Sequence, residues 1–410
     1  MLANPPSAAP EFAAAWAKYQ ADIEEIRQLI EGWSLLHKDP QVLAESFAIL
    51  PQVQAQAWNM VIAPNTDYPR LMVHAYFEPG LFTWNLPCPD FVYRTALLAG
   101  DRRFRIVGRR NSASWVEIQM INAFNGVGAN PVRPLGNFDL DDFVIAPDGG
   151  FEIVVGGEET RPNHLPTDPA AEGNWLLVRQ LVYPGEAAPD MWLEPIDDDE
   201  RRPPMDQMSE AELARRVARA GDMVKHVVMT MTSARLRDVV LPAVGLNAFH
   251  TVVGKVEKEA RDGTNPIAAY QIAVYEIEPD EALVIETEAP PARYWGVHLG
   301  SLLNQTRDYI HHQSSLNDRS ARPDADGKVR VVLSLVDPGV ANWLDTVGTR
   351  QGRVVWRWYA TAEPPQPIIR RVKLADLDAV LPPDTARVTP EERRRQLKAN
   401  ARWRLSHYGY

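Results

Sequence analysis

Two stretches decide the fold of this chain: Asn174-Trp-Leu-Leu-Val-Arg179, and Asn342-Trp-Leu344 with Val354-Val-Trp-Arg357 shortly after it. Each combines an Asn-Trp-Leu signature with an apolar run that carries one arginine. A short apolar run bounded by turn residues is typical of a buried β-strand. The two stretches therefore predict two related β-rich halves, each with such a strand near its end.

Other segments keep the same order and a spacing of roughly 170–180 residues. The matched pairs are Phe104-Arg-Ile with Leu283-Val-Ile, Trp115 with Trp295, and Asp148-Gly-Gly with Asp326-Gly-Lys. Ordered matches at one spacing indicate an internal duplication. Alternating strands separated by turn signals must bury one face against a second sheet, so each half is predicted to be an antiparallel, jelly-roll-like β-sandwich.

The predicted fold class is mainly β, α+β overall, with peripheral helices around two duplicated sandwiches. The predicted domains are an N-terminal helical segment (1–58), the first half (59–200), a helical linker (201–265), the second half (266–375) and a basic C-terminal helix (376–410). Helix starts are indicated by Ser209 followed by Glu212, a capping box, and by Thr389-Pro ahead of the basic segment.

Composition narrows the classes of partner. The chain has 410 residues and a formal net charge of -11, which argues against nucleic acid and anionic membrane as main partners. No run approaches the roughly 18–20 apolar residues of a membrane span. The one cysteine, Cys88, excludes an intramolecular disulfide. A cytoplasmic protein is expected, and a homodimer stays open.

Several motifs of known chemistry are missing from the sequence. It contains no G-x-G-x-x-G or G-x-x-x-x-G-K-[ST] loop, no G-x-S-x-G elbow and no H-E-x-x-H helix. We therefore expect no organic cofactor and no standard hydrolase. A metal is not predicted, although His298, His311 or His312 together with Asp308 leave that alternative open.

Polar residues concentrate between Tyr294 and Asn317, which hold three of the nine histidines. Imidazole titrates near neutral pH, and phenol and amide groups can orient it. The candidate catalytic residues are His311 or His312 as general base and Tyr309 as acid or orienting donor. The candidate substrate-binding residues of the same stretch are Tyr294, His298, Asn304, Arg307 and Asn317.

A second polar cluster precedes the strands of the first half. It consists of Asn65, Asp67, Tyr68 and Arg70. These side chains could close a pocket between the two halves, where ligands are commonly bound. The structural alternative is a hydrogen-bonded turn around Asn65, because Asn and Asp form such turns routinely.

The chain resembles a known family over most of its length, from about Asn59 to Leu374, and most closely in the last third. The segments that carry the resemblance are Tyr93-Arg-Thr-Ala-Leu-Leu, Phe104-Arg-Ile-Val-Gly-Arg, Asp148-Gly-Gly-Phe-Glu-Ile, Gly173-Asn-Trp-Leu, Arg293-Tyr-Trp, Asp326-Gly-Lys-Val-Arg-Val-Val, Asp337-Pro-Gly and Asn342-Trp-Leu-Asp-Thr-Val-Gly. They are similar to the bacterial domain-of-unknown-function family numbered 1214. The resemblance implies a β-rich fold and organisms that degrade aromatic or steroid compounds, and it supplies no catalytic residues.

The working hypothesis is a cofactor-independent enzyme that performs acid/base chemistry on an aromatic small molecule. Lyase-type C–C or C–O cleavage comes first and hydrolysis second. The aromatic content, with 12 Trp, 12 Tyr and 11 Phe, favours a flat apolar ligand. Two alternatives remain: a non-catalytic β-sandwich protein that binds a hydrophobic ligand or carbohydrate, and an assembly component with a large exposed apolar patch.

Overall fold

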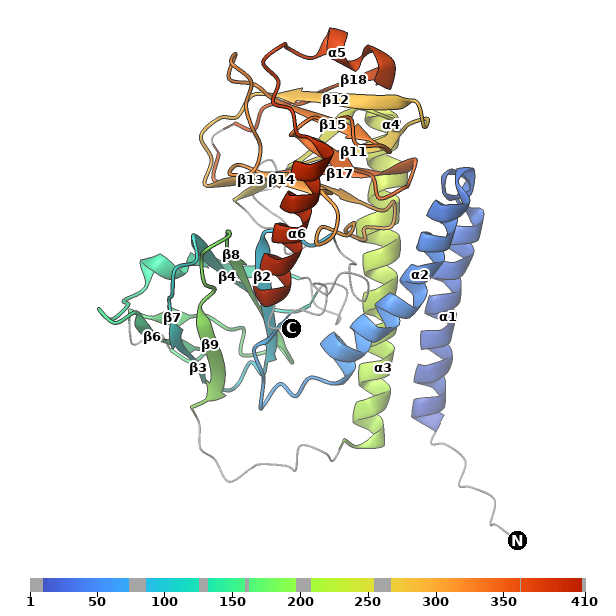
Figure 1. Ribbon diagram of the computed structural model, residues 1–410. Coiled ribbons are helices and arrows are strands. Elements are labelled where there is room, and N and C mark those ends of the chain that lie inside the picture. Colours follow the sequence, from blue (N-terminus) through green and yellow to red (C-terminus); the bar gives the residue numbers. More distant parts are fainter. Residues whose placement is uncertain are drawn as a thin grey trace.

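The structure is a computed structural model that describes residues 10–73, 86–124, 132–158, 162–196, 208–253, 267–361 and 363–407. It contains two β-sandwiches, one from each half of the chain (Figure 1). A long helix runs alongside both sandwiches, and the C-terminal helix lies in front of the place where they meet. The predicted class, α+β with two sandwich-like halves, is confirmed.

The first half has an inner and an outer sheet. The inner sheet has the order β1 (Met72–Val73), β2 (Phe91–Leu98), β8 (Asn174–Leu181), β4 (Trp115–Ile121), β5 (Pro134–Asp139). The outer sheet has the order β7 (His164–Leu165), β6 (Gly150–Val155), β3 (Phe104–Arg109), β9 (Asp190–Pro195). All pairs are antiparallel except β6 with β7.

The second half repeats this arrangement strand for strand. Its inner sheet has the order β10 (Phe249–Val253), β11 (Ala268–Glu276), β17 (Gln351–Tyr359), β13 (Tyr294–Gly300), β14 (Ser315–Asn317). Its outer sheet has the order β16 (Trp343–Asp345), β15 (Val329–Ser334), β12 (Glu281–Thr287), β18 (Ile368–Lys373), again with one parallel pair, β15 with β16. The matching sheet orders confirm that the two halves are related. β10 was assigned to the linker by sequence, yet it is an edge strand of this half.

The two Asn-Trp-Leu segments are not equivalent, and that part of the predicted match is wrong. Asn342 begins the parallel edge segment of the second half, where its carbonyl accepts from Val332 N at 2.8 Å. In the first half this place is taken by Asn163, whose carbonyl accepts from Val154 N at 3.0 Å. Asn174 instead opens the central inner strand β8. The signature recurs in sequence, but it occupies a different sheet in each half.

The match between the two arginine-bearing strands is confirmed. β8 and β17 are the central strands of their inner sheets. On β8, Leu176 and Val178 point into the sandwich core, so Arg179 points out of it; on β17, Trp356 and Trp358 point inward and Arg357 outward. The outward faces of the two inner sheets meet, with ring centroids of Trp115 and Tyr359 5.3 Å apart.

The predicted match between Trp115 and Trp295 is out of register by one residue. Trp115 lies opposite Leu181, two positions past Arg179, whereas Tyr294 lies opposite Tyr359, two positions past Arg357. The counterpart of Trp115 is therefore Tyr294. Trp295 points the other way, into the core of the second sandwich, because a slip of one residue moves a side chain to the opposite face of a sheet.

The helices cover one side of both sandwiches. They are α1 (Pro10–Gly32), η1 (Ser34–Lys38), α2 (Pro40–Ala57), η2 (Trp58–Ile62), and the run α3 (Glu210–Lys225), η4 (His226–Val240), α4 (Leu241–Val244). The predicted cap is confirmed, since the Ser209 hydroxyl accepts from Glu212 N at 3.2 Å. The predicted boundaries at 200/201 and 265/266 lie outside the described residues. Among the helices described, none is long and apolar enough to cross a membrane.

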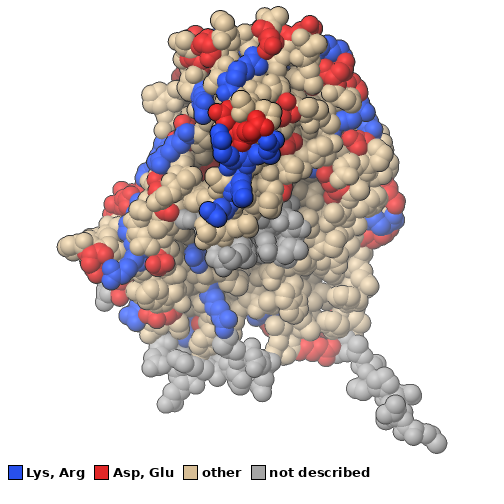
Figure 2. All heavy atoms as spheres, in the orientation of Figure 1, with Lys and Arg blue, Asp and Glu red and all other residues tan. Residues whose placement is uncertain are grey.

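Short helices and the basic C-terminal helix complete the fold. They are η3 (Leu140–Asp142), η5 (Leu374–Asp376), α5 (Leu377–Val380) and α6 (Pro390–His407). Thr389 caps α6 as predicted, through its hydroxyl to Glu392 N at 3.2 Å. Figure 2 shows basic side chains gathered over this helix. Arg393 and Arg404 of α6 are buried against the protein's own acidic groups, Asp337 and Asp90.

We expect the strand pair β12–β18 to lose stability in acid through Glu281. Arg371 donates to its carboxylate at 2.7 Å, and this bond lowers the pKa of Glu281 from 4.5 to about 2. A carboxylate with a depressed folded pKa stabilises the fold above pH 4.5, and the contribution is lost as the pH falls towards about 2. The melting-temperature difference between wild type and Glu281→Gln should therefore shrink from about pH 6 to about pH 3. Glu288→Gln is the control, because Glu288 is exposed and follows the last residue of β12. A pH-dependent difference in melting temperature for that variant would contradict this reason.

Candidate functional site

A cavity of about 280 Å³ lies where the first half, the second half and α6 meet. We call it the seam pocket. Its walls are Asp90, Tyr183 and Pro184 from the first half, Tyr309, His312, Gln313, Ser315, Leu316, Asn317, Arg319, Ser320, Arg322 and Ala341 from the second, and Gln396, Leu397, Asn400, Trp403 and Arg404 from α6. Three predicted site residues, Tyr309, His312 and Asn317, are brought together here. Interfaces between domains are common places for small-molecule sites.

His312 forms an imidazole–carboxylate pair at the wall of this pocket. Its Nδ1 lies 2.7 Å from Oδ2 of Asp345. Asp345 ends the edge strand β16, and its backbone N–H donates to the carbonyl of Gln313 at 2.9 Å. This bond ties the strand to the segment between β13 and β14 that carries His311 and His312, which we call the histidine loop. A carboxylate at Nδ1 favours the tautomer with hydrogen on that nitrogen and leaves Nε2 as a proton acceptor. Sequence reasoning missed Asp345, which is 33 positions away.

His311 points elsewhere. Its Nδ1 lies 3.0 Å from Oδ2 of Asp308, its side chain is 62% exposed, and it is not among the residues that line the seam pocket. The other oxygen of Asp308 accepts from Ile310 N and His311 N, at 2.8 and 3.0 Å. Asp308 therefore shapes the turn that carries both histidines. Of the two predicted bases, the geometry favours His312.

Aromatic and charged groups frame the pocket on the side of the first half. The Tyr183 hydroxyl donates to Asp318 at 2.7 Å, and the Arg319 guanidinium lies 3.6 Å from the centre of the Tyr183 ring. Asp318 is exposed as a residue, but its carboxyl group packs against Tyr183, and this burial raises its pKa. A carboxyl group with a raised pKa is more easily protonated, which suits a proton donor. No motif in the sequence links Tyr183 to Asp318.

Behind the pocket wall a hydrogen-bonded chain leads into the interior. Asp90 accepts from Arg404 at 3.1 Å and from the Tyr294 hydroxyl at 2.8 Å, and that hydroxyl lies 3.1 Å from Cys88 Sγ. All four residues are buried. Burial and the neighbouring Asp90 raise the pKa of Tyr294, and burial raises the pKa of Cys88 to about 11. Both groups therefore stay protonated near neutral pH.

The remaining predicted residues of this stretch have structural contacts. Arg307 is buried and pairs with Glu45 of α2 at 2.5 Å. Asn304 has a positive φ of 72° and accepts from Arg353 at 3.0 Å. His298 is buried on β13, where burial first and the charge of Arg357 second lower its pKa well below the usual value. None of these three lines the seam pocket.

The second predicted cluster does not reach the seam pocket. Asn65 forms the turn named as the alternative, because its side-chain oxygen accepts from Asp67 N and Tyr68 N at 3.0 and 3.2 Å. Tyr68 lies beneath the guanidinium of Arg102, and Arg70 is exposed. The structure thus shows the turn that was named as the alternative, and none of the four side chains lines the seam pocket.

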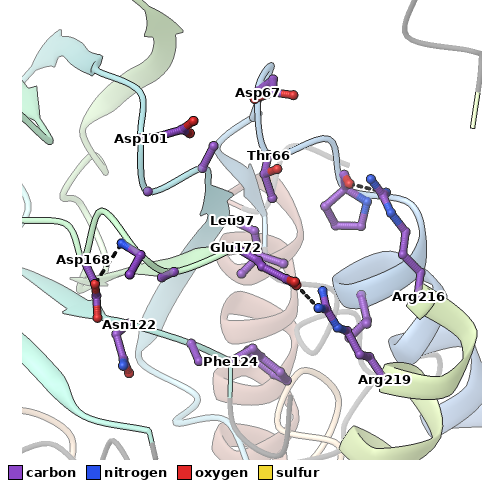
Figure 3. A pocket seen from close by; sticks show the side chains of 18 of the residues that line it. Thr66, Asp67, Leu97, Asp101, Asn122, Phe124, Asp168, Glu172, Arg216 and Arg219 are labelled. Carbon is purple, nitrogen blue, oxygen red and sulfur yellow. Dashed lines mark hydrogen bonds and ion pairs between the residues drawn. The ribbon is translucent and has the colours of Figure 1, made fainter. Parts of the chain in front are cut away.

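Asp67 instead lines a larger cavity of about 690 Å³ between α3 and the first half, the α3 pocket (Figure 3). Its walls are mostly polar, and several of the charged wall residues are paired within the protein. Arg219 meets Glu172, and Arg216 donates to the carbonyls of Ile62 and Pro64 at 2.9 and 2.6 Å. Phe124 supplies an aromatic surface at its base.

The alternative metal ligands are separated in the fold. His298 is on β13, His311 pairs with Asp308, and His312 pairs with Asp345. Within the parts of the chain that the structure describes, no three His, Cys, Asp or Glu side chains are grouped as a metal ion requires.

Comparisons with known proteins support the fold. A crystal structure of an uncharacterised protein from Burkholderia cenocepacia matches with a TM-score of 0.77 and 28% identity, over 88% of this chain and 97% of that one. The VPA0106 protein from Vibrio parahaemolyticus matches with a TM-score of 0.42 and 11% identity, over 78% of this chain and 96% of that one, a likeness too weak to support a conclusion. A search of curated proteins found no match.

A family model described as a protein of unknown function, DUF1214, matches residues 276–363. The segment runs from the end of β11 past β17 and includes the histidine loop and Asp345. It overlaps the last third of the chain, where the resemblance in sequence was strongest. Residues 276–363 of this chain thus match the same family that the sequence motifs resemble.

Proposed function

We propose that this protein is a cofactor-independent enzyme that uses acid/base chemistry on an aromatic small molecule in the cytoplasm. Lyase-type cleavage of a C–C or C–O bond is the reaction class we favour. The observation that carries the proposal is the pair of His312 and Asp345, 2.7 Å apart, at the wall of the seam pocket. An imidazole held by a carboxylate and facing a cavity is a recurrent general base.

The pocket offers groups for each proton transfer in such a cleavage. His312 Nε2 would accept a proton from the substrate, and the carboxylate of Asp345 would stabilise the imidazolium that forms. The electron pair left on the substrate then breaks the C–C or C–O bond. Tyr309, which lines the same pocket, would return a proton to the leaving group.

The lining supports a small aromatic substrate. Tyr183, Tyr309 and Trp403 supply aromatic surface, and Arg319, Arg322 and Arg404 supply positive charge. The volume of about 280 Å³ lies just below the roughly 300–1,000 Å³ of typical small-molecule pockets. These features favour a single-ring aromatic compound with an acidic or hydroxyl substituent over a larger ligand.

The proposal is tested by turnover of a panel of single-ring aromatic acids and alcohols of the kind released from lignin, followed by chromatography of the products. We expect wild type to convert at least one compound and His312→Gln to lose that conversion. His311→Gln serves as the matched control, because His311 is adjacent in sequence but outside the pocket. If His312→Gln turned over the identified substrate as wild type does, the assignment would be wrong.

A second candidate function rests on the α3 pocket. Its paired carboxylates and arginines, with Phe124 at the base, suit a neutral hydroxyl-rich ligand, such as a sugar, better than an ion. We expect calorimetric titration with a panel of monosaccharides and disaccharides to show binding that Phe124→Ala weakens. Absence of heat with every sugar would reject this candidate. A homodimer remains a prediction, which light scattering after size-exclusion chromatography would check.

A further inference from the structure

The two inner sheets carry the same pair of side chains on the faces that meet. Tyr93 of β2 lies opposite Arg179 of β8, and Tyr270 of β11 lies opposite Arg357 of β17. Each arginine is within electrostatic range of tyrosines of the other half, as well as of its own. We define the interhalf cluster as the buried residues Tyr93, Arg179, His298, Arg357 and Tyr359 together with the half-buried Tyr270. Its members come from two sandwiches, so only folding assembles it.

The third strand of each inner sheet breaks the symmetry. Opposite Arg179 stands Glu117, whose carboxylate accepts from the guanidinium at 3.2 Å. The equivalent position opposite Arg357 is Gly296, which has no side chain. The space beside Gly296 is taken by Tyr294, because a Cβ on Gly296 would lie 2.1 Å from the Tyr294 hydroxyl. Arg179 therefore has a carboxylate at this position of the third strand, and Arg357 has none at the equivalent position.

Arg357 is left with little to balance its charge. Its Nη2 donates to the carbonyl of Leu86, and the guanidinium carbon lies 5.3 Å from the centre of the Tyr270 ring. Its Nε has no hydrogen-bond partner, and across the described ranges no carboxylate forms an ion pair with it. The residue is only 8% exposed. A buried cation without a counter-ion is strongly unfavourable unless something else supplies the negative charge.

Two neighbours of Arg357 also carry a buried polar atom that has no hydrogen-bond partner. The Tyr359 hydroxyl and Nε2 of His298 make no hydrogen bond, and these residues are 0% and 1% exposed. Buried polar groups in folded proteins are nearly always paired, so an unpaired set points to a missing ligand, ion or water. The lowered pKa of His298 keeps its imidazole neutral, so it adds no second positive charge beside Arg357.

Burial of an arginine on this face does not by itself leave it unpaired. Arg353 lies four positions earlier on β17 and is also buried. Its guanidinium donates to the carbonyls of Leu302 and Thr232 and to the side chain of Asn304. The sheet can therefore satisfy an arginine with neutral acceptors, and at Arg357 it does not.

We propose that Arg357 and Tyr359, with His298 beside them, bind the carboxylate group of a small organic acid between the two halves. The guanidinium supplies the charge, and the phenol donates a hydrogen bond to the bound anion. The site is separate from the seam pocket, because none of these three residues lines that cavity. The proposal does not depend on a catalytic role for His312.

The test is thermal unfolding of the full chain with acetate or benzoate, against acetamide and benzamide as neutral analogues, at constant ionic strength. A ligand that binds only the folded state raises the melting temperature with concentration. We expect at least one carboxylate to do so and its amide not to. Arg357→Gln should abolish the rise, and Tyr359→Phe should weaken the apparent affinity by about tenfold. His312→Gln should leave the rise intact, which separates this site from the proposed catalytic one.

Arg179→Gln provides the matched comparison without any ligand. It should lower the melting temperature, because the buried carboxylate of Glu117 loses its cationic partner, whereas Arg357→Gln should leave it unchanged or raise it, because an unbalanced charge is removed. The proposal is overturned if neither carboxylate stabilises more than its amide, or if Arg357→Gln keeps the response. An equal loss of melting temperature in the two variants would show that Arg357 is only structural.

Discussion

Replacing Asp345 by asparagine is expected to lower kcat by about 10²–10⁴-fold, with little change in KM, for the substrate that the aromatic panel identifies. The carboxylate now holds His312 through Nδ1 at 2.7 Å. An amide can present its NH₂ group there and stabilise the opposite tautomer, and it carries no charge to balance an imidazolium. Because Asp345 contacts His312 and does not line the seam pocket, its replacement should slow the chemical step without weakening substrate binding.

The turn around Asp345 should survive this change. Its Oδ1 accepts from Val347 N at 2.8 Å, a bond that an asparagine oxygen can also make. The division of the effect between kcat and KM gives a readout that a purely structural role would not produce, because a distorted pocket would weaken substrate binding as well. A variant with wild-type kcat would refute the assignment of Asp345 as the positioning residue.

Replacing Arg404 by methionine is expected to destabilise the fold by about 3–5 kcal/mol. Arg404 and Asp90 form an ion pair in which the side chains are only 7% and 5% exposed. Removing the arginine leaves a buried carboxylate without its cation, although the Tyr294 hydroxyl still donates to it, and removes a donor to the carbonyl of Pro89. Breaking a buried pair from one side costs more than the pair itself contributes.

Urea unfolding of Arg404→Met against Arg394→Met measures this effect. Arg394 is on the same helix, but its pair with Glu391 is exposed on both sides, so its loss should leave the midpoint unchanged. The double variant Asp90→Asn/Arg404→Met should recover part of the loss, since no unpaired charge remains. Equal midpoints for the two single variants would mean that α6 is not held by this pair. The wall that α6 contributes to the seam pocket would then not be held in place by this ion pair.

Local patterns in the sequence carried much of the fold. Strands with apolar residues at alternate positions, Asp-Gly turns and the caps at Ser209 and Thr389 depend on neighbours within a few residues, so they could be predicted directly. The duplication was visible because both copies kept their strand order. The equivalence of the two Asn-Trp-Leu segments failed because a short signature does not say which sheet it joins.

The candidate site was only partly predictable. The histidine loop was recognised from its composition, and it does reach a cavity through Tyr309, His312 and Asn317. The choice between His311 and His312 could not be made, because it depends on Asp345, which a separate edge strand delivers. Arg307 was assigned to the site from its residue type, yet its partner Glu45 is in the N-terminal helical segment, 262 positions earlier by number.

The sequence by itself determined which segments become strands and helices, and that the chain contains two similar halves. The tertiary structure alone decided which arginine is neutralised. Arg179 and Arg357 occupy equivalent positions on the central strands of their sheets. Each lies opposite a tyrosine and points out of its sandwich, but the residue on the third strand is Glu117 for one and Gly296 for the other. The physical reason is that pairing across strands joins residues far apart in sequence, and a charge is balanced by what lies near it in space.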